Sequence, residues 1–325
     1  MKSPWLNHLL VLLFGMSAWL SIDSIYVQLP ILSQSAPESW NLASYIVVII
    51  QISCIFPFTY RIIRNWKREI TEKIESPLIV SLLIIDIIGL LLTTFTYTSV
   101  HSVWLLLSIF ILCIPCTMAD VVFMPLIDSI SIYRRLGSPS LVTTFYIGMG
   151  LGALLPSALS FAQGVNGSTR NFSYPVFIYI VSSLVVISLA AYCGIVIIEK
   201  RMENRRTLSQ STTVPREIHS SVKSIIFPIT VSLVFISLFS PSLLQFQLLI
   251  LSIVQLSIPS VLLPISSGFS AGFLSLLRTA AASRLAHSSH PKALFICGFV
   301  TQFGSFVGAI TVFILANVFH LFISS

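Results

Sequence analysis

Charged residues are scarce in this chain. Only 9% of its 325 residues are Asp, Glu, Lys or Arg, whereas 55% are hydrophobic and the mean hydropathy is +0.95. A soluble protein of this size needs a polar surface, and this composition cannot supply one around so many apolar side chains. The composition therefore excludes an ordinary soluble domain and predicts an integral membrane protein.

Motifs for catalysis and metal binding are also missing. The sequence has no His-Glu-x-x-His, no Gly-x-Ser-x-Gly and no phosphate-binding glycine loop. All five cysteines lie in or beside apolar runs, where they suit small buried side chains better than a disulfide framework. Cys113 and Cys116 have the spacing of a redox or zinc pair, but no second Cys/His pair accompanies them. We expect no enzyme activity, no metal and no cofactor.

Long apolar runs are what the sequence has in abundance. Each approaches the roughly 20 residues that a helix needs to cross hydrocarbon. They predict an all-α, polytopic membrane protein with spans at 8–28, 42–60, 78–98, 102–123, 141–162, 174–198, 224–240, 254–277 and 293–319. We expect three parts: a six-span bundle at 1–198, a cytoplasmic linker at 199–223 and a shortened bundle of about three spans at 224–325.

The basic residues predict the orientation in the membrane. With nine spans, Arg170 alone falls on one side, and the other 17 of the 18 Lys and Arg residues fall on the opposite side. Basic loops stay in the cytoplasm, so the amino terminus is expected inside and the carboxyl terminus outside. Two spans instead of one within 241–277 would place the basic residues near Arg278 outside. Orientation thus accounts for the net charge of +7, and we predict no nucleic-acid partner.

Two glycosylation acceptors agree with this orientation. Asn166-Gly-Ser and Asn171-Phe-Ser both lie in a loop expected outside, which favours a secretory-pathway protein of the plasma membrane. The first apolar run could instead be a cleaved signal peptide, with Lys2 as its basic start. No small-x-small cleavage site follows that run, so we interpret it as a span.

An acid lies inside the first span. On one helix, Trp19, Asp23, Tyr26 and Pro30 would share a face, because steps of three and four residues are each about one turn. A carboxylate facing hydrocarbon costs roughly 2.5–3.5 kcal/mol on insertion scales. Asp23 is therefore expected to point into the bundle.

The fourth span repeats this arrangement, with Cys116, Asp120 and Phe123 on one face. Rings beside acids suit a flat solute with a polar edge. The alternative is that each acid only bonds a Ser, Thr or backbone group of a neighbouring helix. For Asp86, which has no aromatic residue on its face, both interpretations remain open.

Small and amide residues mark further positions. Five glycines predict close helix packing, with lining of the solute path as the alternative: Gly148, Gly150, Gly152, Gly304 and Gly308. Gln302 lies within a span and needs a polar partner.

Several of these stretches are specific. The run HLLVLLFGMSAWLSIDSIYVQLP, followed by ESWNLASY, resembles the opening of the solute-carrier riboflavin transporters of animals, as do ADVVFMPL, GLGALLPSALSFAQGV and TQFGSFVGAI. The resemblance implies riboflavin import across the plasma membrane by alternating access. It also implies a six-plus-five bundle resembling the equilibrative nucleoside transporters and, more distantly, the major facilitators.

For a carrier, the residues expected to bind the solute combine the ring-and-acid faces of the first and fourth spans with Gln28, Met149 and Gln302. They are Trp19, Asp23, Tyr26, Gln28, Asp120, Phe123, Met149 and Gln302. Departures from the family are that Asp23 and Asp120 replace Asn, Gln28 replaces Glu, Met149 replaces Gln, and Cys54 stands where Asn is common. Acids in place of amides predict pH-sensitive binding and leave proton coupling open.

The expected partners are riboflavin and the lipid bilayer. The family has eleven spans against nine here, and the missing stretch fits its seventh and eighth. A shortened, non-transporting variant that binds a partner or acts as a receptor is therefore a second hypothesis. A carrier for another aromatic solute, such as a nucleoside, is a third.

Overall fold

The computed structural model describes residues 4–36, 42–99, 102–129, 140–164 and 171–207. Within these ranges the chain is helical, with short connections and no strand. The helices are α1 (Pro4–Met16), α2 (Leu20–Val27), α3 (Leu29–Ser35), α4 (Leu42–Ser53), α5 (Ile55–Trp66), α6 (Arg68–Thr96), α7 (Ser102–Ser129), α9 (Ser140–Gln163) and α10 (Tyr174–Thr207). The predicted all-α membrane fold is confirmed.

The first six predicted spans fall on segments that can cross a membrane. Five are long and apolar enough by themselves: Tyr45–Arg64, Ile74–Thr96, Val103–Phe123, Leu141–Gln163 and Tyr174–Arg201. The sixth is the pair Trp5–Met16 and Leu20–Val27, which is bent by 46° at its break. The three predicted spans after residue 207 lie outside the described residues, as do Gln302, Gly304 and Gly308.

The first span is not the single helix that was predicted. It is interrupted at residues 17–19 and again at Gln28. At the first break the Ser17 hydroxyl donates to the Phe14 carbonyl at 2.7 Å, an alternative to the helical ladder. At the second, Pro30 has no N–H to donate to the carbonyl four residues earlier. The predicted stripe is therefore divided between α2 and α3.

The second span is also broken, between α4 and α5. Pro57 lacks the N–H that would bond the carbonyl of Ser53, four residues earlier. The Thr117 hydroxyl of α7 lies 3.3 Å from that carbonyl and donates to it. A side chain of the neighbouring helix thus satisfies a backbone group that the proline leaves open.

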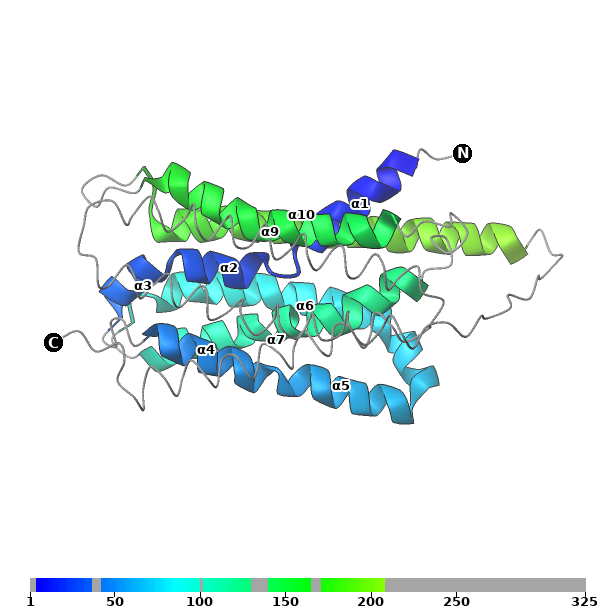
Figure 1. Cartoon of the computed structure of the whole chain (residues 1–325), viewed down its shortest axis with the longest axis horizontal. Helices are drawn as coiled ribbons and strands as arrows, with labels where there is room; N and C mark the ends of the chain where they lie inside the picture. Colours follow the sequence, from blue (N-terminus) through cyan, green and yellow to red (C-terminus); the bar gives the residue numbers. More distant parts are fainter. Residues whose placement is uncertain (1–3, 37–41, 100–101, 130–139, 165–170, 208–325) are drawn as a thin grey trace, which may run out of the picture.

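The helices pack as a bundle with roughly aligned axes. In Figure 1, α1, α9 and α10 form one side, α6 and α7 occupy the middle, and α4 and α5 form the other side. α1 packs on α9 and α10, α6 on α7 and α10, and α4 on α7. α2 lies inside this arrangement and contacts α7, α9 and α10.

Glycines set the distance between α1 and α9. A Cβ added at Gly148 would overlap the carbonyl oxygen of Leu12, and one at Gly152 would overlap that of Met16. From the other side, a Cβ at Gly15 would overlap the carbonyl oxygen of Phe145. The two backbones are therefore in direct contact, an approach that small residues allow in membrane bundles.

The outer surface of the bundle is apolar, as lipid contact requires. Ile84 and Ile88 of α6 and Ile187 of α10 are exposed. Tryptophans are exposed near helix ends, with Trp66 at the end of α5 and Trp104 near the start of α7. Tryptophan favours the level of the lipid headgroups, so these positions fit the two membrane surfaces.

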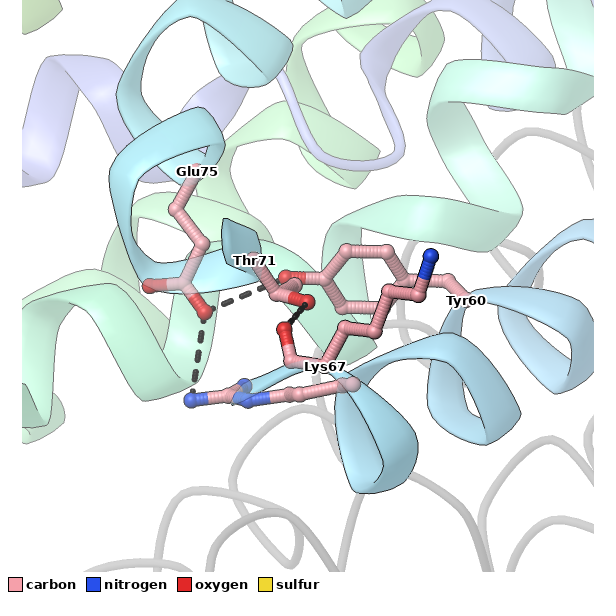
Figure 2. Close-up of polar contacts among 5 residues, drawn as sticks. Tyr60, Lys67, Thr71 and Glu75 are labelled. Carbon is pink, nitrogen blue, oxygen red and sulfur yellow. Dashed lines mark hydrogen bonds and ion pairs between the residues drawn. The ribbon is translucent and has the colours of Figure 1, made fainter. Parts of the chain in front are cut away.

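A buried acid fixes the connection between α5 and α6. The Tyr60 hydroxyl donates to Glu75 Oε1 at 3.1 Å, and Arg64 Nη2 lies 3.2 Å from the same oxygen (Figure 2). Beside them, the Thr71 hydroxyl donates to the Lys67 carbonyl at 2.8 Å. Because the Glu75 side chain is only 5% exposed, these partners replace the water it has lost.

The last described helix extends into the predicted linker. α10 has 34 residues and continues past residue 198 to Thr207. The first part of the 199–223 linker is therefore helical, and residues 208–223 lie outside the described residues.

Candidate functional site

The candidate site is built on one face of α2. Asp23 and Tyr26 on α2, and Trp19 at its amino-terminal cap, are partly exposed. Residues that alternate with them, including Ser21 and Ile25, are buried. α2 therefore turns one side into the bundle and leaves the predicted ring and acid side partly open.

Tyr26 connects this face with α7. It lies within electrostatic range of Asp23 on its own helix and of Cys113 and Cys116 on α7. The two helices are also packing neighbours. The predicted aromatic residue of the first span and the polar stretch of the fourth span are thus neighbours in the fold.

Gln28 is placed behind this face rather than on it. Its side chain is 1% exposed, and its Nε2 donates to Gln163 Oε1 at 2.8 Å. Gln163 in turn donates to the Phe172 carbonyl at 3.1 Å. Gln28 therefore attaches the carboxyl end of α2 to the end of α9.

The remaining predicted residues lie on α7 and α9. Asp120 is on α7 between Cys116 and Phe123, and its side chain is outside the described part of the structure. Phe123 is 1% exposed and Met149 of α9 is 5% exposed. Contact between these three residues and a solute remains a prediction.

An aromatic cluster that was not predicted surrounds Phe14 of α1. Its ring centroid lies 4.8 Å from that of Phe123, 5.7 Å from Phe145 and 5.0 Å from Tyr192. The cluster joins α1, α7, α9 and α10, and stacked or tilted ring pairs stabilise such junctions beyond their buried area. The sequence carried a signal for it, since Phe14 directly precedes Gly15 and Phe145 lies about one helical turn before the packing glycine Gly148.

The surroundings of Asp86 agree with a hydrogen bond to a neighbouring helix. Asp86 is 2% exposed on α6, and the Ser21 hydroxyl of α2 donates to its Oδ2 at 2.8 Å. The sequence could not choose between a solute site and a bond to a neighbouring helix. The second interpretation agrees with this geometry.

The described residues hold no group of three or more His, Cys, Asp or Glu side chains suited to a metal ion. Cys54, Cys113 and Cys116 are buried, and none of them forms a disulfide in the part of the chain that the structure describes.

Comparison with known proteins now identifies the family. The model of solute carrier family 52, riboflavin transporter, matches residues 3–170 and 250–324. The chain belongs to this family. The matched part includes α1 to α9, so the candidate face of α2 lies within it.

Curated relatives within the riboflavin transporter family share about a third of the aligned residues. Riboflavin transporter rft-2 of Caenorhabditis elegans is 33% identical over 207 residues, which cover 58% of this chain and 42% of the relative. Member 2 of the family from Sus scrofa is 30% identical over 217 residues, covering 59% and 46%. Human member 3 is 32% identical over 168 residues, covering 49% and 34%. The chain spans less than half the length of these relatives.

A solved structure agrees with the fold of this family member. The crystal structure of the human organic anion transporter MFSD10 (TETRAN) superposes with a TM-score of 0.51 at 11% identity, covering 98% of this chain and 95% of the other. At that identity the likeness concerns the fold alone, and it supports the predicted major-facilitator-like bundle.

Proposed function

We propose that this protein imports riboflavin across the plasma membrane by alternating access. Its membership of the riboflavin transporter family carries the proposal. The partly exposed α2 face supports it, because that face lies in the matched part of the chain.

The chemistry of riboflavin suits this face. The vitamin has a flat three-ring system with a polar edge, and a chain of hydroxyl groups. Trp19 and Tyr26 offer ring faces for stacking, and Asp23 offers carboxylate oxygens to N–H or hydroxyl donors. Gln28, Asp120, Phe123, Met149 and Gln302 are proposed to complete the binding site.

A broken first span also supports transport. In many transporters the solute is held near the middle of the membrane by discontinuous helices, whose breaks expose backbone polar groups. Here α1 and α2 form such a pair, with a bend of 46°. Rocking of the first bundle against the second would then open the site to each side in turn.

The proposed orientation has the amino terminus in the cytoplasm and the carboxyl terminus outside. The distribution of Lys and Arg supports it. The loop that begins after α9 would then be extracellular. Asn171 of that loop is exposed and donates its side-chain N–H to the Ala162 carbonyl at 2.9 Å.

Uptake by the purified full chain in liposomes tests the proposal. We expect saturable uptake of labelled riboflavin that unlabelled riboflavin competes away and a nucleoside does not. Trp19→Ala should raise KM, since it removes a proposed stacking face. Trp5→Ala is the matched control, because Trp5 is exposed near the start of α1.

Two other outcomes would contradict riboflavin import. Preferential competition by a nucleoside would favour a carrier of another aromatic solute. Riboflavin binding without uptake would favour the non-transporting variant.

A further inference from the structure

α2 needs support from the rest of the bundle. It has eight residues, is preceded by a break at 17–19 and followed by another at Gln28, and the side chain of its amino-terminal cap, Trp19, makes no capping hydrogen bond. A helix this short is not stable by itself, so its position depends on tertiary contacts. Those contacts also decide where Trp19, Asp23 and Tyr26 lie.

The side of α2 that faces α6 carries Ser21. Ser21 and Asp23 are two residues apart, about 200° around a helix, so they point to opposite sides. Ser21 is 2% exposed, and its hydroxyl donates to Asp86 Oδ2 of α6 at 2.8 Å. The side of α2 opposite the candidate face is therefore hydrogen-bonded to Asp86, in the middle of α6.

The other polar groups described around Asp86 do not occupy its carboxyl oxygens. Its Oδ1 is buried with no hydrogen-bond partner among the described residues. The Glu75 carboxylate pairs with Arg64, and Asp86 takes no part in that ion pair. Among neighbouring groups, Cys113 of α7 lies within electrostatic range of Asp86. Within the described residues, Ser21 is thus the side chain that donates a hydrogen bond to Asp86.

Ser24 provides an internal comparison on the same helix. It is fully buried, like Ser21, but its hydroxyl donates to the Leu20 carbonyl of α2 itself at 2.6 Å. One buried serine joins α2 to α6, whereas the other bonds within α2. Removing either hydroxyl deletes the same atom from a buried site, but removing the Ser21 hydroxyl also detaches α2 from Asp86.

We propose that Asp86 is a positioning residue for solute binding, which fixes the rotation of α2 through Ser21 and so holds Trp19, Asp23 and Tyr26 toward the solute. The effect on riboflavin rests on the proposed function. The attachment of α2 to α6 does not.

Hydrogen exchange tests the attachment without any solute. In the purified full chain, Ser21→Ala and Asp86→Leu should speed amide exchange in the peptide covering residues 19–28 by about ten-fold, the range expected for one buried hydrogen bond. Ser24→Ala should change it much less. Asp86→Asn should stay close to the wild type, because its amide oxygen still accepts from Ser21.

Uptake kinetics test the link to solute binding. Ser21→Ala and Asp86→Leu should each raise KM for riboflavin about ten-fold with a smaller change in kcat. The double variant should be no worse than either single variant, because both remove the same bond. Asp86→Asn should keep KM near the wild-type value, because its amide oxygen still accepts from Ser21. A merely space-filling role of Asp86 would instead make the KM effects of Ser21→Ala and Asp86→Leu additive.

The outcomes separate the two proposals. Unchanged exchange in Ser21→Ala and Asp86→Leu, or an equal effect of Ser24→Ala, would overturn the positioning role. Additive KM effects in the double variant would also overturn it. If the exchange results hold but the wild type takes up no riboflavin, the positioning of α2 stands and the proposed function fails.

Discussion

Asp23 and Asp86 are both acids in membrane-spanning segments, but their surroundings differ. Asp23 is partly exposed on the open side of α2, whereas Asp86 is 2% exposed and accepts from Ser21. An acid that water or a solute can reach is placed to bind a ligand, whereas a buried acid is placed to hydrogen-bond a neighbouring helix. The two residues are therefore expected to respond differently to the same substitution.

Asp23→Asn tests the acid on the open side. We expect the substitution to flatten the dependence of riboflavin uptake on external pH, because an amide at that position cannot change its charge. Labelled uptake across a range of external pH checks this. Asp23→Glu is the control, since it keeps an ionisable group. An unchanged pH profile in Asp23→Asn would remove Asp23 from this role.

Part of the candidate site could be predicted residue by residue. Trp19, Asp23 and Tyr26 were recognisable because an acid between rings is unusual in an apolar run. For two further predicted residues the structure adds the protein neighbours, with Gln28 bonded to Gln163 and Phe123 against Phe14, and solute contact at both stays a prediction. Helical spacing gives the face of a residue but not which neighbouring helix covers that face.

At the scale of elements, the contact of α1 with α9 depends on the missing side chains of glycine. Gly148→Ala should destabilise the protein by about 1–3 kcal/mol, because its Cβ would overlap the Leu12 carbonyl and force the helices apart. Gly194→Ala is the matched control. Its Cβ would lie 3.5 Å from the flexible end of Leu10, an ordinary contact.

Thermal unfolding of the two glycine variants in detergent measures this difference. A lower midpoint for Gly148→Ala than for Gly194→Ala is expected. Equal midpoints would mean that α1 and α9 can separate slightly without loss.

The connection of α5 and α6 gives a second prediction at this scale. Glu75→Leu should lower the unfolding midpoint, because it leaves the Tyr60 hydroxyl and the Arg64 guanidinium without this acceptor, at a cost of about 1–3 kcal/mol. Ser81→Ala is the control on α6, since Ser81 is exposed and bonds its own helix at Pro77. A midpoint equal to that of Ser81→Ala would show that the cluster adds no stability.

The positions of the first six spans could be predicted from the sequence, but their breaks could not. Hydropathy is averaged over a window about as long as a span, so one missing N–H at Pro30 or Pro57 does not change it. The break at 17–19 has no proline at all and depends on the Ser17 hydroxyl bonding the Phe14 carbonyl. Such a choice is decided by packing against other helices.

At the scale of the whole molecule, charge and glycosylation make a joint prediction about orientation. With an extracellular loop after α9, the expressed protein should carry sugar at Asn166 or Asn171, and removal by a glycosidase should increase its mobility on a gel. Asn166→Gln combined with Asn171→Gln should abolish that shift. A shift that persists would assign the sugar elsewhere, and no sugar in the wild type would contradict the predicted orientation.

The length of α10 has a consequence for how this molecule can be handled. Its 34 residues extend about 51 Å, well beyond the roughly 30 Å of hydrocarbon. Charged residues begin at Glu199, so the helix carries Thr207 about 14 Å past its last apolar turn. An antibody epitope inserted after Thr207 would stand clear of the lipid headgroups. Staining of that epitope before and after permeabilising the cell would then show directly which compartment this end of the bundle faces.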